Sequence, residues 1–256
     1  PRGMGFPPVV TILALAKRLP KHLTASVATE AAVREPLTRE HEMRVLIAYY
    51  SRTGYTGTLA QRIAEELKSR GHEVVFERIE VARQKSRWNL LFRQAYQYPL
   101  VLLCLVSASW RRWWLKHYIQ PEDHLQPLSH PDVSGFDRVC IGGPKWCYIS
   151  YPVSRYLRLL QGLQNKKVSA FSTFAGPPFE VFEIELIFKP MSDRIQALGG
   201  TLIATLGLSS NYHELGILPV FRRVTPNVFK RSLESFTIDS EYGREKIREF
   251  CDENEQ

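Results

Sequence analysis

The sequence has few cysteines and none of the spacings that mark a metal site. Its four cysteines, Cys104, Cys140, Cys147 and Cys251, form no C-x-x-C pair, and no histidine stands at a metal-ligand spacing from them. We therefore expect no metal and reduced thiols, as in a cytosolic protein. No Ser-His-Asp or Cys-His arrangement is recognisable either, so no catalytic residue is assigned.

Acidic residues are missing from one long stretch, residues 81–120, which contains no Asp or Glu. The same stretch holds seven basic residues: Arg83, Lys85, Arg87, Arg93, Arg111, Arg112 and Lys116. It also holds eight aromatic residues: Trp88, Phe92, Tyr96, Tyr98, Trp110, Trp113, Trp114 and Tyr118. Since the whole chain has a net charge of +8, removing these +7 leaves the remainder at +1.

Long apolar runs are also missing from this basic and aromatic stretch. Its apolar part, Pro99–Trp110, is far shorter than the roughly 20 residues that span a bilayer. Flanking Trp and Arg residues favour a segment that lies on an anionic membrane surface. A helical lid packed on the domain and an interface between copies of the chain remain open. Contact with nucleic acid is the least favoured reading, because no DNA- or RNA-binding motif accompanies the charge.

The stretch Arg44–Lys68 organises the rest of the chain. An unbroken apolar run, Val45–Tyr50, predicts a buried strand, and the helix after it has one apolar face. Between them, the turn Ser51–Thr56 offers three hydroxyls and Gly54 at a helix N-terminus, which favours a bound phosphate. An ordinary capped helix start is the alternative. The turn is neither a G-x-x-x-x-G-K-[ST] nor a G-x-G-x-x-G motif.

Apolar strands and helices alternate along the remaining chain. Further strands are predicted over His72–Glu80, Asp137–Gly143, Lys167–Phe174 and Thr201–Leu208. Helices are predicted from Pro152, over Glu180–Leu198 with a bend near Pro190, and over Ser240–Asn254 with Ser240 as N-cap. This alternation indicates an α/β protein with a parallel sheet between two layers of helices.

The turn sequence Ser51-x-Thr53-Gly54-x-Thr56 after an apolar strand resembles the phosphate loop of flavodoxins and their FMN-binding relatives. A second motif, Gly142-x-Pro144-x-Trp146, resembles the segment that lies against the flavin ring in that family. The resemblance covers roughly Met43–Leu208 and the last helix. It implies a flavodoxin-like three-layer sandwich with a five-stranded parallel sheet of order 2-1-3-4-5, and FMN at its switch point.

The resemblance also implies which residues bind the cofactor. The phosphate contacts are Ser51, Arg52, Thr53, Gly54, Tyr55 and Thr56; the ring contacts are Pro144, Lys145, Trp146, Cys147 and Tyr148; the contacts to the polar edge are Thr173, Phe174, Ala175 and Gly176. Trp146 as an ordinary core aromatic is the alternative. Lys145 either raises the flavin potential as a nearby cation or is a solvated surface lysine.

The remaining segments are expected to be additions to a domain spanning residues 43–256. Residues 1–42 are predicted to be a loosely ordered N-terminal extension, with one helix over Pro8–Arg18; a targeting segment is the alternative. Residues 81–120 are expected to be a helical insertion after the second strand, and residues 209–236 an irregular excursion.

Together these features predict an FMN-dependent redox protein. A one-electron carrier that docks on a protein partner and a reductase of a small acceptor such as a quinone both remain open. The expected location is cytoplasmic, with peripheral membrane contact through residues 81–120. A cofactor-free flavodoxin fold that serves as an interaction module is the alternative from another class.

Overall fold

The computed structural model describes residues 42–83, 97–117, 123–146, 148–210 and 218–256. The chain divides into two units, Pro1–Glu42 and Met43–Gln256, and the second contains the sheet and its helices. The predicted N-terminal extension with its helix Pro8–Arg18 lies outside the described residues, apart from Glu42. Residues 84–96 and 118–120 of the insertion lie outside them as well.

Five parallel strands form one sheet, in the order β2-β1-β3-β4-β5. The strands are β1 (Arg44–Tyr49), β2 (Glu73–Arg78), β3 (Arg138–Pro144), β4 (Lys167–Phe174) and β5 (Thr201–Ser209). All four neighbouring pairs are parallel, and β4 and β5 share a register irregularity at Val168/Ser169. The predicted strand order and flavodoxin-like topology are therefore confirmed.

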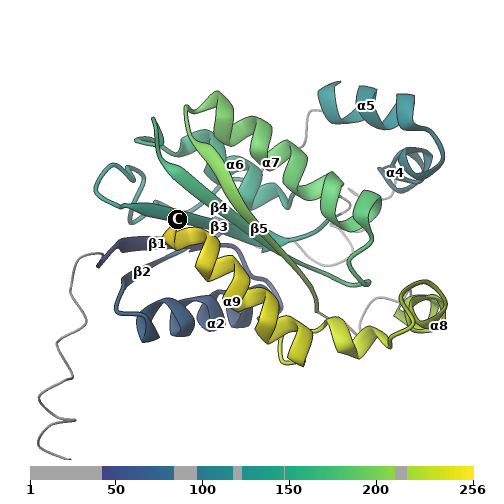
Figure 1. Ribbon diagram of the computed structural model, residues 1–256. Helices are drawn as coiled ribbons and strands as arrows, with labels where there is room; N and C mark the ends of the chain where they lie inside the picture. The colour runs from purple at the N-terminus through teal and green to yellow at the C-terminus, as the bar shows by residue number, and fades with distance from the viewer. Residues whose placement is uncertain (1–41, 84–96, 118–122, 147, 211–217) are drawn as a thin grey trace, which may run out of the picture. The chain divides into compact units, whose positions relative to one another are not determined.

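Helices cover both faces of the sheet (Figure 1). They are α2 (Tyr55–Ser69), α4 (Gln97–Val106), α5 (Ala108–His117), α6 (Tyr151–Leu159), α7 (Leu186–Ala197), α8 (Leu218–Phe229) and α9 (Glu241–Glu255), with a π-helix η1 (Glu180–Glu185) and a 3-10 helix η2 (Leu233–Phe236). The helices α6 and α7 lie over one face, and α2 and α9 over the other.

The alternation of side chains along β1 explains the two cores. Leu46 and Ala48 belong to the cluster that includes α6 and α7, whereas Val45 and Ile47 belong to the cluster with α2 and α9. All four side chains are fully buried. A strand covered on both faces has to be apolar at every position, which is why Val45–Tyr50 reads as one unbroken apolar run.

Two predicted elements differ in the structure, and proline is involved in both. The helix expected over Glu180–Leu198 is a π-helix followed by α7 from Leu186. Because Pro190 has no N–H for the carbonyl of Leu186, the change of helix type falls one turn before the proline. The excursion expected to be irregular contains α8, whose Pro219 lies in the first turn, where a proline is tolerated.

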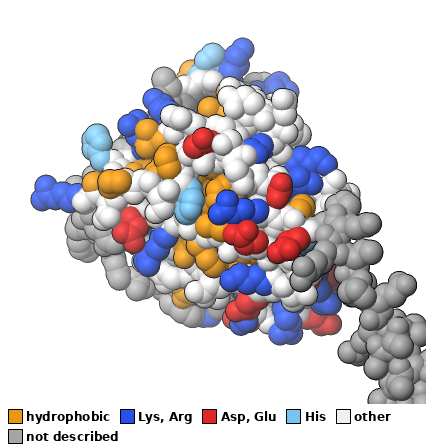
Figure 2. Space-filling model, turned by 90° about the vertical axis from the view of Figure 1, so that its left-hand side faces the viewer, with side chains coloured by type: hydrophobic (Ala, Val, Ile, Leu, Met, Phe, Trp, Pro, Cys, Tyr) orange, Lys and Arg blue, Asp and Glu red, His pale blue; other side chains and the backbone are white. Residues whose placement is uncertain are grey.

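The side of the domain where β1 begins has mixed charge. Figure 2 shows basic and acidic side chains interspersed on this side around a patch of hydrophobic ones. Arg70 on this part of the chain binds Glu66, Asp252 and Glu255, at 2.8, 2.6 and 3.2 Å. Arg70 is thus balanced by acids close to it.

Gly142 provides a test of how tightly the sheet is packed. A Cβ at this position would lie 2.2 Å from the ring of Phe171 on the neighbouring strand. We expect Gly142→Ala to lower the free energy of unfolding by about 2–3 kcal/mol, because neither strand can move away. Gly135→Ala is the control, since its nearest neighbour is an Arg44 side-chain atom at 3.9 Å. Equal midpoints of urea unfolding for the two variants would contradict this packing.

Candidate functional site

The predicted cofactor residues gather at one edge of the sheet. Because all strands are parallel, their carboxyl ends lie together, and the segments that follow β1, β3 and β4 leave the sheet at the same edge. These are the turn 51–56, the loop 145–148 and the segment 175–178. Whether the segments form one site depends on the contacts between them.

The turn after β1 leaves backbone donors available. Gly54 is the N-cap of α2, with a φ of 93°, and its position gives no side-chain cap to the helix. Within the described residues, no acceptor meets the backbone N–H of Thr53, Gly54 or Thr56. The N-terminus of this 15-residue helix therefore presents these three N–H groups, an arrangement that binds anions.

The hydroxyls of the turn are partly used within the protein. The backbone N–H of Gly57 donates to Ser51 Oγ at 3.1 Å, so Ser51, three residues before the N-cap Gly54, satisfies one donor of the first helical turn. Thr56 Oγ1 lies 2.7 Å from Thr173 Oγ1 in a buried hydrogen bond. Thr53 is exposed. The capped-helix alternative thus accounts for Ser51, and the exposed hydroxyl of Thr53 and the free N–H groups are what the phosphate prediction rests on.

Thr173 joins the three segments. Its hydroxyl contacts Thr56 of the first turn, and its carbonyl accepts the backbone N–H of Lys145 at 2.9 Å. The N–H of Tyr50 donates to the carbonyl of Gly142 at 3.0 Å, which ties β1 to the same loop. The structure therefore brings together the turn, the loop after β3 and the end of β4.

Trp146 lies between two tyrosine rings. Its ring meets Tyr50 edge-on at 5.6 Å and Tyr151 edge-on at 5.5 Å between centroids. Trp146 is partly buried and packs against the core from its rim. Both contacts are perpendicular, and no described aromatic ring is stacked parallel to the indole.

Burial separates the other ring candidates. Tyr148 is 1% exposed and belongs to the core, and burial raises its pKa, so its phenol stays neutral. Phe174 is also buried, whereas Pro144 and Ala175 are partly exposed. Cys147 lies outside the described residues.

The remaining predicted positions surround the turn and the end of β4. Arg52 and Tyr55 are partly exposed, and Gly176 is buried. A Cβ on Gly176 would lie 3.1 Å from Glu183 Oε1 and from the ring of Phe221. Gly176 is thus held by side chains from two other elements.

Lys145 is in a buried ion pair. Its ammonium lies 2.8 Å from Glu183 Oε2 and 3.4 Å from the centre of the Phe182 ring. The side chains are 6% and 2% exposed, so the prediction of a solvated surface lysine is wrong. Burial raises the pKa of Glu183, and Lys145 and the N–H of Gly176 oppose that shift.

Sequence reasoning missed Glu183, Tyr50 and Tyr151. Glu183 and Glu185 are acids inside the largely apolar run Val181–Phe188, a pattern that signals partners for them. Tyr50 and Tyr151 directly follow β1 and begin α6, at positions that face the carboxyl edge. Burial raises the pKa of Tyr50 to about 12, so it too remains a neutral phenol.

Comparisons with known proteins give likenesses of fold. No protein-family model matches the chain, and no curated protein matches it. Solved structures that it resembles include a flavoprotein in complex with FMN from Lactobacillus acidophilus, 20% identical, with a TM-score of 0.41 over 64% of this chain and 93% of that one.

Two flavodoxins are also among the similar structures. Oxidised flavodoxin 2 from Bacillus cereus is 16% identical, with a TM-score of 0.45 over 82% of this chain and 96% of that one. Two-electron reduced flavodoxin from Megasphaera elsdenii is 18% identical, with a TM-score of 0.37 over 66% and 88%. The flavodoxin-like fold of this chain rests on its own strand order.

The buried ion pair predicts a stability effect with a pH dependence. Lys145→Met leaves Glu183 without its partner, and we expect a loss of about 3–5 kcal/mol in the free energy of unfolding near neutral pH. Because burial holds the pKa of Glu183 above its ordinary 4.5, the folded variant binds more protons than the unfolded one. Its stability should therefore fall as the pH rises above about 4.5 and recover in acid.

The control for this ion pair is Asp193→Asn, which breaks the exposed pair between Lys189 and Asp193. Exposed pairs contribute about 0–1 kcal/mol, so this variant should unfold almost as the parent does. The double variant Lys145→Met, Glu183→Leu should regain most of the lost stability. Urea unfolding from pH 4 to 8 measures all three, and equal effects of K145M and D193N would contradict a buried pair.

Proposed function

We propose that this chain binds FMN at the carboxyl edge of its sheet and transfers electrons through it. One observation carries the proposal: the free N–H groups at the start of α2 and the loop that holds Trp146 are tied together through Thr173. A phosphate site and an aromatic site within one cluster of loops match a ligand with an anionic tail and a flat ring.

The phosphate end fits the donors that are present. The N–H groups of Thr53, Gly54 and Thr56 and the exposed hydroxyl of Thr53 supply hydrogen bonds, and the helix dipole favours the negative charge. Gly54 needs its positive φ to expose these groups, while the space beside it is open. No metal is needed, and among the described residues none of the His, Cys, Asp and Glu side chains gather as a metal site.

The ring end is assigned to Trp146 and its two tyrosine neighbours. Tyr50 and Tyr151 both contact the indole and so restrict its rotation. The ring contact predicted for Tyr148 is not part of the proposal, because its side chain lies in the core. Thr173 and Gly176 remain the proposed contacts to the polar edge of the ring.

The protein contributes binding, orientation and electrostatics. Bound flavin supplies the reversible uptake of one or two electrons. Lys145 does not present a free positive charge to the site, because Glu183 neutralises it at 2.8 Å. Lys145 therefore does not raise the redox potential of the flavin as a free cation would. Electrons enter and leave at the side where Trp146 is partly exposed.

The insertion indicates the side from which an electron acceptor would approach the flavin. The helices α4 and α5 form a hairpin that packs on the domain: Arg111 binds Glu185 of η1 at 3.1 Å, and α5 contacts α7. Gln97 at the start of α4 donates to Tyr151 Oη at 2.9 Å, next to Trp146. The hairpin thus adjoins the proposed ring site.

The outer surface of the hairpin favours contact with a membrane. Leu103, Val106 and Trp113 are 44%, 81% and 51% exposed, and the exposed cations Arg112 and Lys116 lie on the same helix as Trp113. Apolar side chains with an aromatic ring and basic neighbours are typical of a segment lying on an anionic bilayer surface. No helix among the described residues is long and apolar enough to span one. A quinone-like acceptor dissolved in the membrane would reach the flavin here.

The FMN proposal predicts that the protein takes up FMN with a dependence on Gly54. Gly54→Ala forces an L side chain into a φ of 93° and should shift the turn. We expect FMN binding to weaken by about five- to thirtyfold, which corresponds to 1–2 kcal/mol. Riboflavin, which lacks the phosphate, should bind both forms about equally. Quenching of flavin fluorescence measures each affinity.

The matched control is Gly71→Ala at the other end of α2. Gly71 has a φ of 94° and equally open surroundings, so the strain is the same without a role in the site. Protein that stays colourless and takes up no FMN would instead favour a cofactor-free interaction module. This second candidate is favoured by the hydrogen bonds that the hydroxyls of Ser51 and Thr56 already form within the protein.

The membrane proposal predicts co-sedimentation with vesicles containing anionic lipid. Leu103→Asp and Arg112→Glu should each reduce the bound fraction severalfold, because one removes apolar area and the other repels the lipid. Leu159→Asp is the control, as this leucine at the end of α6 is 36% exposed. Equal binding by all variants, or equal binding to neutral vesicles, would remove the membrane surface from the proposal.

A further inference from the structure

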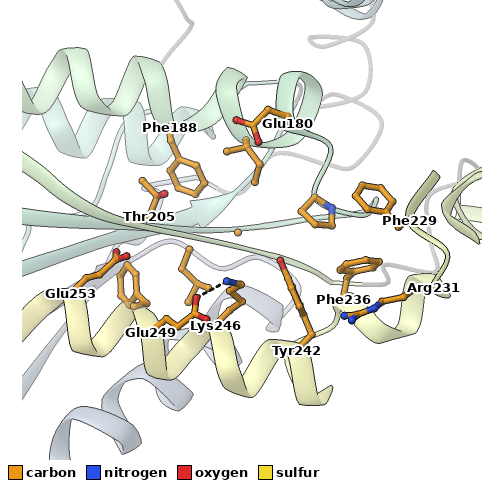
Figure 3. A pocket seen from close by; sticks show the side chains of 15 residues that line it. Glu180, Phe188, Thr205, Phe229, Arg231, Phe236, Tyr242, Lys246, Glu249 and Glu253 are labelled. Carbon is orange, nitrogen blue, oxygen red and sulfur yellow. Dashed lines mark hydrogen bonds and ion pairs between the residues drawn. The ribbon is translucent and has the colours of Figure 1, made fainter.

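A groove runs along the free edge of β5, and of the segments at the proposed FMN site only Pro178 lines it. Its volume is about 690 Å³, and Thr205, Leu206 and Gly207 of β5 lie at its floor. One wall comes from η1 and α7, the other from α9, and side chains near α8 and η2 lie at one end (Figure 3). The groove therefore follows the strand, with a helix above and a helix below.

The floor of the groove is a strand edge without a partner. β5 is the last strand of the sheet and pairs with β4 on its other side. Among the described residues, only a bridge from Ser209 to Thr237 touches the free edge, at its very end. The outward N–H and C=O groups of the preceding residues thus face the groove, and such groups accept an added strand.

The side chains at this edge leave access to the backbone. Thr205 is exposed, whereas a strand that is covered on both faces carries an apolar residue at each position. Gly207 has no side chain, and a Cβ there would lie 2.7 Å from the Phe174 ring. Natural edges are often blocked by lysine, proline or a charge pointing inward, and β5 from Thr201 to Ser209 has none of these.

The walls offer apolar contacts on both sides of the strand. Ile184 and Phe188 line one side, and Tyr242 and Phe250 the other. Phe229 and Phe236 pack on each other at one end, with ring centroids 5.1 Å apart. Alternate side chains of an extended peptide point to opposite faces, so one wall would receive the odd positions and the other the even ones.

Charge indicates the composition of the occupant. The lining contains three acids, Glu180, Glu249 and Glu253, against the cations Arg231 and Lys246. Lys246 is already bound to Glu249. Within the described residues, Glu180, Glu253 and Arg231 form no ion pair. These two acids and one cation leave the groove with a net negative charge.

We propose that the free edge of β5 binds an extended segment of a partner protein, which adds as a sixth strand and carries a lysine or arginine toward Glu253 or Glu180. A second copy of this chain is the less favoured occupant, because helices line both walls of the groove beside β5 and would stand on both sides of an approaching β5 as well.

The experiment uses the full ¹⁵N-labelled chain and defined probe peptides. The probes are capped heptapeptides of alternating valine and threonine, with a lysine at the first or at the last position. Amide shifts over 201–208 and in the walls should titrate with one of them. Two N-methylated forms of that peptide, methylated at odd or at even residues, test whether it pairs as a strand. In a paired strand only alternate N–H groups bond to β5, so one form should bind at least about tenfold more weakly and the other should not.

Variants of the chain locate the contact. Thr205→Lys should abolish the titration, whereas Thr201→Lys, at an exposed position outside the groove, should leave it unchanged. Glu253→Lys should weaken binding about threefold, as expected for a rim charge, and Glu245→Lys on the same helix should not.

Several outcomes would overturn the proposal. Equal loss with both methylated peptides, or no shift at millimolar peptide, excludes strand addition. Shifts of β5 amides that depend on protein concentration without peptide point to a second copy. Amides of β5 that are protected from exchange in the dilute free chain, and indifferent to peptide, point to a segment of the same chain.

Discussion

The contacts of one residue, Thr173, decide whether this protein has a site at all. Its hydroxyl binds Thr56 at the start of α2, and its carbonyl holds the N–H of Lys145 after β3. Each neutral hydrogen bond contributes only about 1 kcal/mol net. Their importance is geometric, because they join three segments that come from distant parts of the chain, together with the bond from Tyr50 N–H to the carbonyl of Gly142.

Much of the fold follows from the sequence by elementary rules. Unbroken apolar runs such as Val45–Tyr50 predict buried parallel strands, and all five strands lie within a residue or two of their predicted bounds. Ser240 caps α9 as predicted, its Oγ accepting the N–H of Gly243 at 2.9 Å. These features depend on residues close together in the chain, which a single sequence displays directly.

What the sequence did not reveal depends on pairs far apart in the chain. Lys145 reads as a surface lysine until Glu183 is placed beside it, and neither residue predicts the other without the fold. Tyr148 reads as a ring contact because it is aromatic and near Trp146, yet the turn after β3 directs it into the core. The helix α8 was hidden by Pro219 and Pro226, which usually mark irregular chain.

The two proposed surfaces use different physics. The carboxyl edge combines helix N–H groups and an aromatic face, which suits a small anionic ligand. The edge of β5 offers backbone groups between apolar walls, which suits another strand. The α4–α5 hairpin adjoins the first surface through Gln97 and Tyr151. A redox protein needs both a cofactor and a way to choose its partner, and these features divide the two tasks.

A crystal structure of the chain grown with FMN would show where the phosphate and the ring bind. We expect the phosphate within about 2.7–3.2 Å of the backbone nitrogens of Thr53, Gly54 and Thr56, with the ring against Trp146 and the Thr56–Thr173 contact intact. A phosphate bound anywhere else, or a ring on the far side of the sheet from Trp146, would contradict the FMN proposal.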